Sequence, residues 1–264
     1  MLKELIYEYF DNERKHKEER DKKYLDSDKK FNIAPSYLTD CIRKIWYKKT
    51  KTIQSNPVSL HSYIKFSMGD AIHEKLAEIL SKVAYIKKGE VWHDKEIHGI
   101  EWIYRVDNYI LLKSNEFIIE IKSIYGNTAY NDLPKENAIM QLFCYLLLEK
   151  INQGILLYLC RDTGFIEEFH FSIEGLKEKY GNKYKERLSK LKSIRDNIEQ
   201  IPNREYNINL KNLNGEIKTD FQKDGIKYKS DWQCLYCQWY NECWEKELKK
   251  IKNHKFYIDG TFYD

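Results

Sequence analysis

Apolar side chains recur along the chain with two different periods, which predict helices alternating with strands. Spacings of three or four residues indicate helices at 1–30, 41–49, 72–83, 135–150 and 173–200. Strict alternation and short apolar runs indicate strands at 91–98, 101–106, 117–124, 155–160 and 165–171. Helices and strands in this order predict a mixed α/β fold, in which helices pack on a mixed sheet.

Residues with special backbone preferences mark where several of these elements begin. Pro35 interrupts the chain, and Ser36 can cap the helix that follows at 41–49. Gly69 is predicted to precede the amphipathic helix at 72–83.

The length of 264 residues allows one large domain or two small ones. Residues 11–30 contain 8 Lys+Arg and 7 Asp+Glu, which predicts a helix whose outer half is solvated. We expect this charged helix at 1–30 to precede a single domain at 31–264. Within that domain, parts at 31–67 and 203–253 are predicted to enclose a core at 68–172.

The composition argues for a folded protein outside the membrane. Hydrophobic residues make up 42% of the chain and charged residues 33%, but the aromatic content of 14% is unlike that of disordered segments. No apolar run approaches the roughly 20 residues of a membrane helix, and the charged start lacks a signal-peptide core. We therefore expect a cytoplasmic protein.

Net charge gives only a weak indication of binding partners. The chain has 45 Lys+Arg and 41 Asp+Glu, a formal charge of +4, which is far below that of a polybasic nucleic-acid binder. A basic surface would have to come from local clusters. The segment 173–200, with 8 Lys+Arg against 5 Asp+Glu, is one candidate.

Three of the six cysteines form a C-x2-C-x5-C motif: Cys234, Cys237 and Cys243. In a chain without a signal peptide, such thiols indicate metal ligands before disulfides. Cys41 is the best candidate for a fourth ligand, because Cys144 and Cys160 lie in apolar segments and are expected to be core thiols. Four thiolates suit either tetrahedral zinc or an iron–sulfur cluster, and the spacing does not choose between them.

A second set of candidate residues combines two carboxylates with a lysine. Asp107 ends one predicted strand, and a hairpin through residues 108–116 would return Glu120 alongside it. The two carboxylates could then hold Mg²⁺ or Mn²⁺. Lys122 shares the strand face of Glu120 and could position or deprotonate a water molecule. The alternative is a buried ion pair without any chemistry.

Two helical positions could extend this set. A lone helical histidine such as His73 is more often a packing residue than a ligand, unless it lies near Asp107 and Glu120. Gln141 and Tyr145 are four residues apart and share a helix face, where they could contact a phosphate or a base. Taken alone, packing on the helix surface is the favoured interpretation of this pair.

Together, these motifs resemble those of RecB-like nucleases of the PD-(D/E)xK superfamily, specifically the iron–sulfur branch that contains the CRISPR-associated "Cas-four" exonucleases. The family pattern is a Cys before a basic-aromatic stretch, then G-x3-H, Asp, E-x-K, Q-x3-Y and C-x2-C-x5-C. All elements occur here in order: Cys41, Gly69, His73, Asp107, Glu120, Lys122, Gln141, Tyr145, Cys234, Cys237 and Cys243. The chain departs from the pattern at Ile42, where proline is frequent, and lacks a glycine shortly before Asp107.

The resemblance implies a restriction-endonuclease-like core, a mixed sheet flanked by helices, with an iron–sulfur region formed by both ends of the chain. It implies Mn²⁺ or Mg²⁺ bound by His73, Asp107, Glu120 and the backbone carbonyl of Ile121. Lys122 would be the catalytic lysine, and Gln141 and Tyr145 would contact DNA. A four-iron four-sulfur (4Fe-4S) cluster would be bound by Cys41, Cys234, Cys237 and Cys243.

The function implied by the resemblance is a metal-dependent exonuclease acting on single-stranded DNA or DNA ends. It could process spacer precursors in CRISPR adaptation beside an integrase, or work with a helicase. One alternative is a non-catalytic iron–sulfur subunit that binds DNA ends in a helicase–nuclease or adaptation complex. Another is a zinc-stabilised interaction protein in which the E-x-K motif is accidental.

Overall fold

The computed structural model describes most of the chain: residues 2–27, 31–88, 91–112, 114–126, 133–206, 222–223, 226–227, 232–235, 237–248, 256–258 and 261–263. It divides into two compact units. The terminal unit comprises Met1–Asp21, Asp40–Ile64 and Asp196–Asp264, and the central unit comprises Lys22–Thr39 and Lys65–Arg195. None of the helices in the described ranges is long and apolar enough to cross a membrane.

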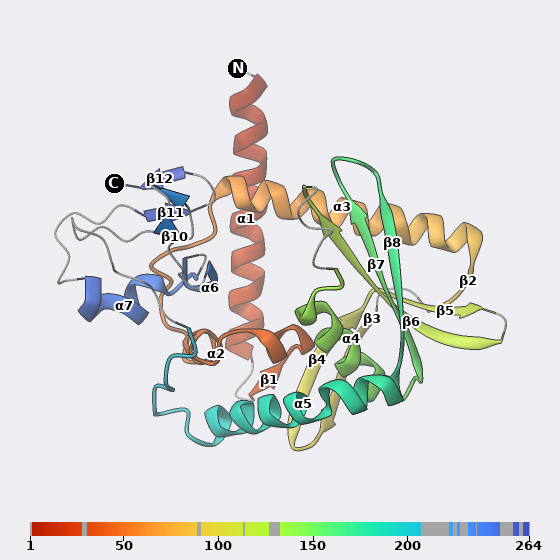
Figure 1. Ribbon diagram of the computed structural model, residues 1–264. Helices are drawn as coiled ribbons and strands as arrows, with labels where there is room; N and C mark the ends of the chain where they lie inside the picture. Colours follow the sequence, from red (N-terminus) through yellow and green to blue (C-terminus); the bar gives the residue numbers. More distant parts are fainter. Residues whose placement is uncertain are drawn as a thin grey trace. The chain divides into compact units, whose positions relative to one another are not determined.

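The central unit contains a five-stranded sheet in the order β2-β5-β6-β7-β8 (Figure 1). The strands are β2 (Tyr85–Lys88), β5 (Asn108–Leu112), β6 (Asn115–Ile124), β7 (Gln153–Cys160) and β8 (Ile166–Ser172). Among the described strands of this sheet, β6 and β7 are the parallel pair, with α4 (Glu136–Glu149) between them in the chain. The mixed sheet with flanking helices that the sequence predicts is confirmed.

Strand β6 presents different chemistry on its two faces. Ile119 and Ile121 pack against Leu76 of α3 (Leu60–Val83) in the apolar core. The intervening residues point to the opposite face, because side chains alternate along a strand. There Lys122 contacts Gln141 of α4. The charged residues of β6 therefore lie on the α4 side of the sheet.

A smaller sheet in the central unit has the order β1-β4-β3. It consists of β1 (Asn32–Ile33), β3 (Val91–Ile97) and β4 (Ile100–Val106), and alternate residues of β4 are buried. The short helix η1 (Pro35–Thr39) is held by α5 (Ile173–Asp196), where Arg187 donates a hydrogen bond to the Leu38 carbonyl at 2.6 Å.

The terminal unit is built around α2 (Ile42–Lys49) and α7 (Tyr240–Leu248). Indole N–H groups of Trp46 and Trp239 donate to the carbonyls of Ile198 and Thr52, at 2.7 and 2.8 Å, and Trp239 stacks on Tyr47. The other described elements are α6 (Trp232–Leu235) and two short hairpins, β9 (Gln222–Lys223) with β10 (Ile226–Lys227) and β11 (Phe256–Ile258) with β12 (Thr261–Tyr263).

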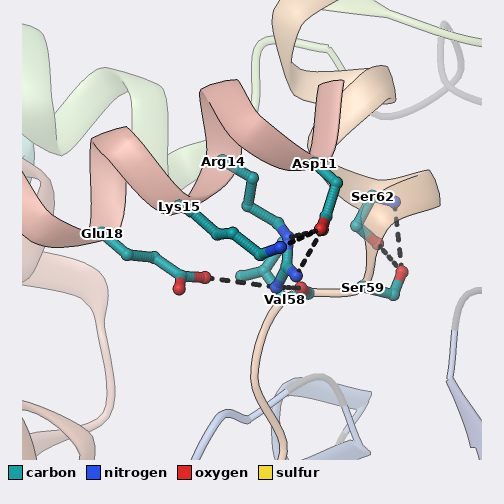
Figure 2. A network of polar contacts seen from close by, with 7 residues as sticks. All are labelled: Asp11, Arg14, Lys15, Glu18, Val58, Ser59 and Ser62. Carbon is teal, nitrogen blue, oxygen red and sulfur yellow. Dashed lines mark hydrogen bonds and ion pairs between the residues drawn. The ribbon is translucent and has the colours of Figure 1, made fainter. Parts of the chain in front are cut away.

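Helix α1 (Leu2–Ser27) begins in the terminal unit, where Arg14 is the centre of a polar network (Figure 2). Its guanidinium contacts Asp11 at 2.7 Å and Glu18 at 3.3 Å, three and four residues away on the same helix face. It also donates to the carbonyl of Val58 at 3.3 Å. The predicted charged helix is thus tied to the chain just before α3.

Several element boundaries differ from the sequence prediction. Ser36 lies inside η1, and the N-cap residue of α2 is Cys41. Helix α3 begins at Leu60, well before Gly69, because the Ser59 hydroxyl accepts a hydrogen bond from the Ser62 N–H and caps the helix there. The segment 108–116, predicted only as a hairpin connection, carries strand β5.

Candidate functional site

Asp107 lies where the chain passes from one sheet of the central unit to the other. β4 ends at Val106 and β5 begins at Asn108, which pairs with Ile119 of β6. The Asp107 Oδ2 atom accepts a hydrogen bond from the Ile121 N–H at 2.7 Å. The predicted hairpin is therefore confirmed, and it returns β6 to the side of Asp107.

Glu120 is a buried carboxylate with one oxygen engaged and one not. Its side chain is 3% exposed, and Oε1 accepts from the Lys122 ammonium at 2.5 Å. Oε2 is buried and has no hydrogen-bond partner within the described part of the chain. The ion pair of the non-catalytic alternative is thus present, but it leaves one carboxylate oxygen unsatisfied, which is costly without a further partner.

The electrostatics of these groups depend on one another. Burial raises the pKa of Glu120 to about 7, helped by the nearby negative charge of Asp107 and opposed by Lys122. Burial alone would lower the pKa of Lys122, but the charge and hydrogen bond of Glu120 outweigh it and raise that pKa. Lys122 therefore remains an ammonium group. An added positive charge beside Glu120 would favour the ionised carboxylate.

His73 belongs to the same group of side chains. Its Nδ1 atom lies 3.6 Å from Asp107 Oδ2. Burial lowers the pKa of His73, but Asp107 and Glu120 together raise it above its usual value. One helical turn earlier, a Cβ on Gly69 would lie 3.4 Å from the Ser123 hydroxyl, so α3 passes close to β6 at this point. The G-x3-H spacing thus sets His73 beside Asp107.

Gln141 and Tyr145 face the sheet and do not form an exposed helix surface. Gln141 accepts from the Lys122 ammonium at 3.1 Å and donates to the Tyr145 hydroxyl at 2.9 Å. Tyr145 is 4% exposed, and its ring lies 5.7 Å from that of Tyr104. The two side chains do pack within the protein, and Lys122 draws the amide of Gln141 toward the sheet. Contact with DNA stays a prediction.

A divalent cation can be tested against these donors. In the parts of the chain that the structure describes, no three His, Cys, Asp or Glu side chains are already arranged as a metal site. Two carboxylates and an imidazole are nevertheless ligands that Mn²⁺ and Mg²⁺ accept. The Oε2 atom of Glu120 makes no hydrogen bond to the described residues and could coordinate such an ion. The residues therefore fit such an ion. The Ile121 carbonyl as a further ligand stays a prediction.

The sequence prediction missed a partly buried polar cluster next to Tyr104, whose ring lies against Tyr145. Glu149 of α4 accepts from the Tyr104 hydroxyl and from the Lys95 ammonium, the latter at 2.7 Å, and lies 3.3 Å from His93 Nδ1. His93 Nε2 in turn lies 3.2 Å from the Tyr109 hydroxyl. Burial raises the pKa of Glu149, but Lys95, Tyr104 and His93 lower it overall. The period of two along strand β3, which places His93 and Lys95 on the same inward face, is the sequence signal that could have identified this cluster.

The four cysteines of the predicted cluster all belong to the terminal unit. Burial raises the pKa of Cys234 to about 12 and of Cys237 to about 11, and Cys41 and Cys243 each add to both shifts. The Arg43 guanidinium lies 3.7 Å from the Cys243 sulfur. The thiols affect one another electrostatically, but the described residues, these four cysteines included, hold no three side chains already arranged around a metal ion, so the shared centre stays a prediction. Cys144 and Cys160 are buried in the central unit.

Comparisons with known proteins give only distant likeness. No family model and no curated protein matches the sequence. Among solved structures, SSO0001 has a TM-score of 0.47 and 21% identity, over 66% of this chain and 85% of that one. An alkaline exonuclease from Laribacter hongkongensis has a TM-score of 0.43 and 12% identity, over 64% and 91%. A phage-related exonuclease from Haemophilus somnus has 0.43 and 16%, over 60% and 80%.

Proposed function

We propose that the protein is a metal-dependent deoxyribonuclease that hydrolyses phosphodiester bonds in single-stranded DNA, acting as an exonuclease. The proposal rests on one observation: the buried carboxylate of Glu120 has an unsatisfied oxygen and lies in a group with Lys122 and Asp107. A purely structural ion pair between Glu120 and Lys122 would have no need of a buried oxygen without a hydrogen bond, nor of a second carboxylate in the same group. Perturbed ionisable groups of this kind mark functional sites.

The chain's own residues would divide the work. Asp107, Glu120 and His73 would hold the cation, which supplies charge neutralisation and a more acidic water when bound. Lys122 is fixed between Glu120 and Gln141, so its ammonium group has a defined position rather than a mobile one. From there it would orient the attacking water and stabilise the negative charge that develops on the phosphoryl oxygens. Gln141 would keep Lys122 aligned through its hydrogen bond.

A cleavage assay tests the proposal. The purified chain is incubated with 5′- or 3′-labelled single-stranded oligonucleotides and Mn²⁺ or Mg²⁺, and the products are resolved by length. We expect stepwise shortening, lost in EDTA and reduced about 10²–10³-fold in Glu120→Gln. Glu168→Gln, which changes an exposed glutamate of the same unit, is the matched control and should cleave normally. A Glu120→Gln variant as active as wild type would refute the assignment.

We also propose that Cys41, Cys234, Cys237 and Cys243 bind a 4Fe-4S cluster. The C-x2-C-x5-C motif and the location of all four thiols in the terminal unit support the grouping. Protein purified without oxygen should be brown and absorb broadly near 400 nm, as iron–sulfur thiolate centres do. Colourless protein that contains one zinc per chain would refute the cluster and indicate a structural zinc site. That outcome leaves the nuclease proposal standing.

A further inference from the structure

The ends of β6 and β7 bring together an exposed tyrosine and an exposed arginine. The two strands are parallel, so their C-terminal ends lie at the same edge of the sheet. Tyr125 follows β6 and Arg161 follows β7. The Arg161 N–H donates to the Ile124 carbonyl at 2.9 Å, which fixes the two chain segments side by side.

The side chains of this pair are preorganised but open to solvent. Tyr125 is 71% exposed, and the Arg161 guanidinium carbon lies 5.9 Å from its ring centroid. Arg161 also donates to the Lys65 carbonyl of α3 at 3.4 Å. Asp162 is held by the Cys160 thiol at 2.6 Å and by the Gly126 N–H at 3.3 Å. The pair thus has a fixed cation beside a largely uncovered aromatic ring.

Helix α3 relates this pair to the catalytic residues. Lys65, Gly69 and His73 are spaced four apart and therefore share one face of the helix. Along that face Lys65 contacts Arg161, Gly69 approaches Ser123, and His73 lies beside Asp107. The distance along the helix from Lys65 to His73 is about 12 Å. Contacts along this one helix face therefore lead from the Tyr125–Arg161 pair to His73 and Asp107.

We propose that Tyr125 and Arg161 form a binding site for single-stranded DNA, in which a base stacks on the tyrosine ring and the guanidinium contacts a backbone phosphate. This inference rests on the proposed nuclease function and names further substrate-binding residues for it. Aromatic rings and arginines are the groups with which proteins hold single strands without regard to sequence. Paired duplex bases are already stacked, so the site selects an unpaired strand.

Another exposed aromatic–arginine pair in the central unit is less suited to this role. Arg105 lies 5.7 Å from the ring of Trp92, across the β3–β4 ladder. The same strand face carries the exposed carboxylates of Asp94 and Glu96, which repel phosphate. The Tyr125–Arg161 pair also has a neighbouring carboxylate, Asp162, so what favours it is its link to His73 through α3.

Binding of fluorescent oligonucleotides to the full chain in EDTA, which prevents cleavage, tests the inference. The probes are a dT12 strand, an abasic 12-mer with the same phosphates, and a duplex. Tyr125→Ala should weaken dT12 binding about 5- to 100-fold. It should leave binding of the abasic strand and of the duplex unchanged. Tyr125→Phe, which keeps the ring, should bind dT12 like wild type.

Two further variants sharpen the result. Tyr85→Ala removes a tyrosine that is 68% exposed on β2, an edge strand separated from β6 by β5, and should have no effect. Arg161→Ala should weaken the binding of both the dT12 strand and the abasic strand. It should also reduce the slope of log Kd against log salt by about 0.7, which is the value of one phosphate contact.

Equal dT12 affinity in wild type and Tyr125→Ala would overturn the inference, as would an equal loss on the abasic strand. The nuclease proposal is judged separately, by whether wild type cleaves with Mn²⁺. If wild type cleaves DNA but Tyr125→Ala binds dT12 as tightly as wild type, only the binding-site inference is refuted. If Tyr125→Ala loses affinity for dT12 alone but wild type does not cleave DNA, only the nuclease proposal is refuted.

Discussion

The carboxylate–lysine site and the cysteine region differ in how far apart in the sequence their residues lie. Asp107, Glu120 and Lys122 come from one hairpin, whose register fixes their separation. The thiols come from the two ends of the chain, with Cys41 before α2 and Cys243 in α7. A local hairpin can set a site by its own hydrogen bonds. Thiols from distant segments need a bound partner or a well-packed core to remain together.

The largest expected effect is on the distant set. Cys41→Ser removes one proposed ligand and should abolish the bound iron or zinc, destabilising the terminal unit. For structural zinc, the binding free energy that also supports folding is on the order of 10 kcal/mol. Metal analysis and thermal unfolding measure both effects. Cys144→Ser, which changes a core thiol, is the control and should keep its metal; equal metal content in Cys41→Ser would contradict the ligand assignment.

A smaller effect is expected when the local site is broken. At pH 9, above the pKa of about 7 that burial gives Glu120, Lys122→Met removes the cation beside the carboxylate and should lower the free energy of unfolding by about 2–3 kcal/mol. Adding Glu120→Gln removes the buried charge and should restore much of that stability without restoring activity. Urea unfolding of the single and double variants measures this. Additive losses in the double variant would show that the two groups do not form a pair.

The cluster around Glu149 predicts a pH-dependent contribution. Its folded-state pKa is lowered, so its stabilisation is present above the unfolded value of about 4.3 and is lost as the pH falls toward the folded pKa. Glu149→Gln should cost about 1.5–3 kcal/mol at pH 7, because hydrogen bonds to a charged acceptor are removed. The difference from wild type should shrink between pH 5 and 3 in urea unfolding. A difference that is constant with pH would show that the carboxylate charge does not matter.

The smallest effect is expected for the partly exposed network around Arg14 of α1. Arg14→Ala removes the contacts with Asp11, Glu18 and Val58 (Figure 2) and should cost about 0.3–1 kcal/mol. The ion-pair part of this cost should decline in 1 M salt, where charges are screened. Lys75→Ala, which removes an exposed pair with Glu78, provides a comparison. A cost above 2 kcal/mol, or a cost unchanged in 1 M salt, would contradict a weak and screened ion-pair contribution.

The local features of the site could be predicted from the sequence because they follow strand and helix periods. The apolar run around Glu120 identifies β6, and a hairpin then brings Asp107 to Ile121. The apolar period likewise identifies the helix that carries His73, although α3 already includes Gly69, which was predicted to precede it. The strand and helix periods themselves need no knowledge of how distant elements pack.

Features that depend on packing between distant elements could not be predicted. The early start of α3 at Leu60 depends on the Ser59 cap in a segment without clear apolar periodicity. Glu149 belongs to a polar cluster because β3 and β4 place His93, Lys95 and Tyr104 next to the end of α4. The Tyr125–Arg161 pair depends on the parallel pairing of β6 with β7, across 36 residues of sequence.

The most direct test of the account compares the rate at which wild type and Lys122→Ala shorten a labelled single-stranded DNA in Mn²⁺. Both proteins are first matched by circular dichroism, and Lys75→Ala serves as the exposed-lysine control. The account predicts cleavage by wild type and the control, and a loss of about 10²-fold or more in Lys122→Ala. Wild-type protein that leaves the strand intact, or a Lys122→Ala variant of full activity, would contradict it.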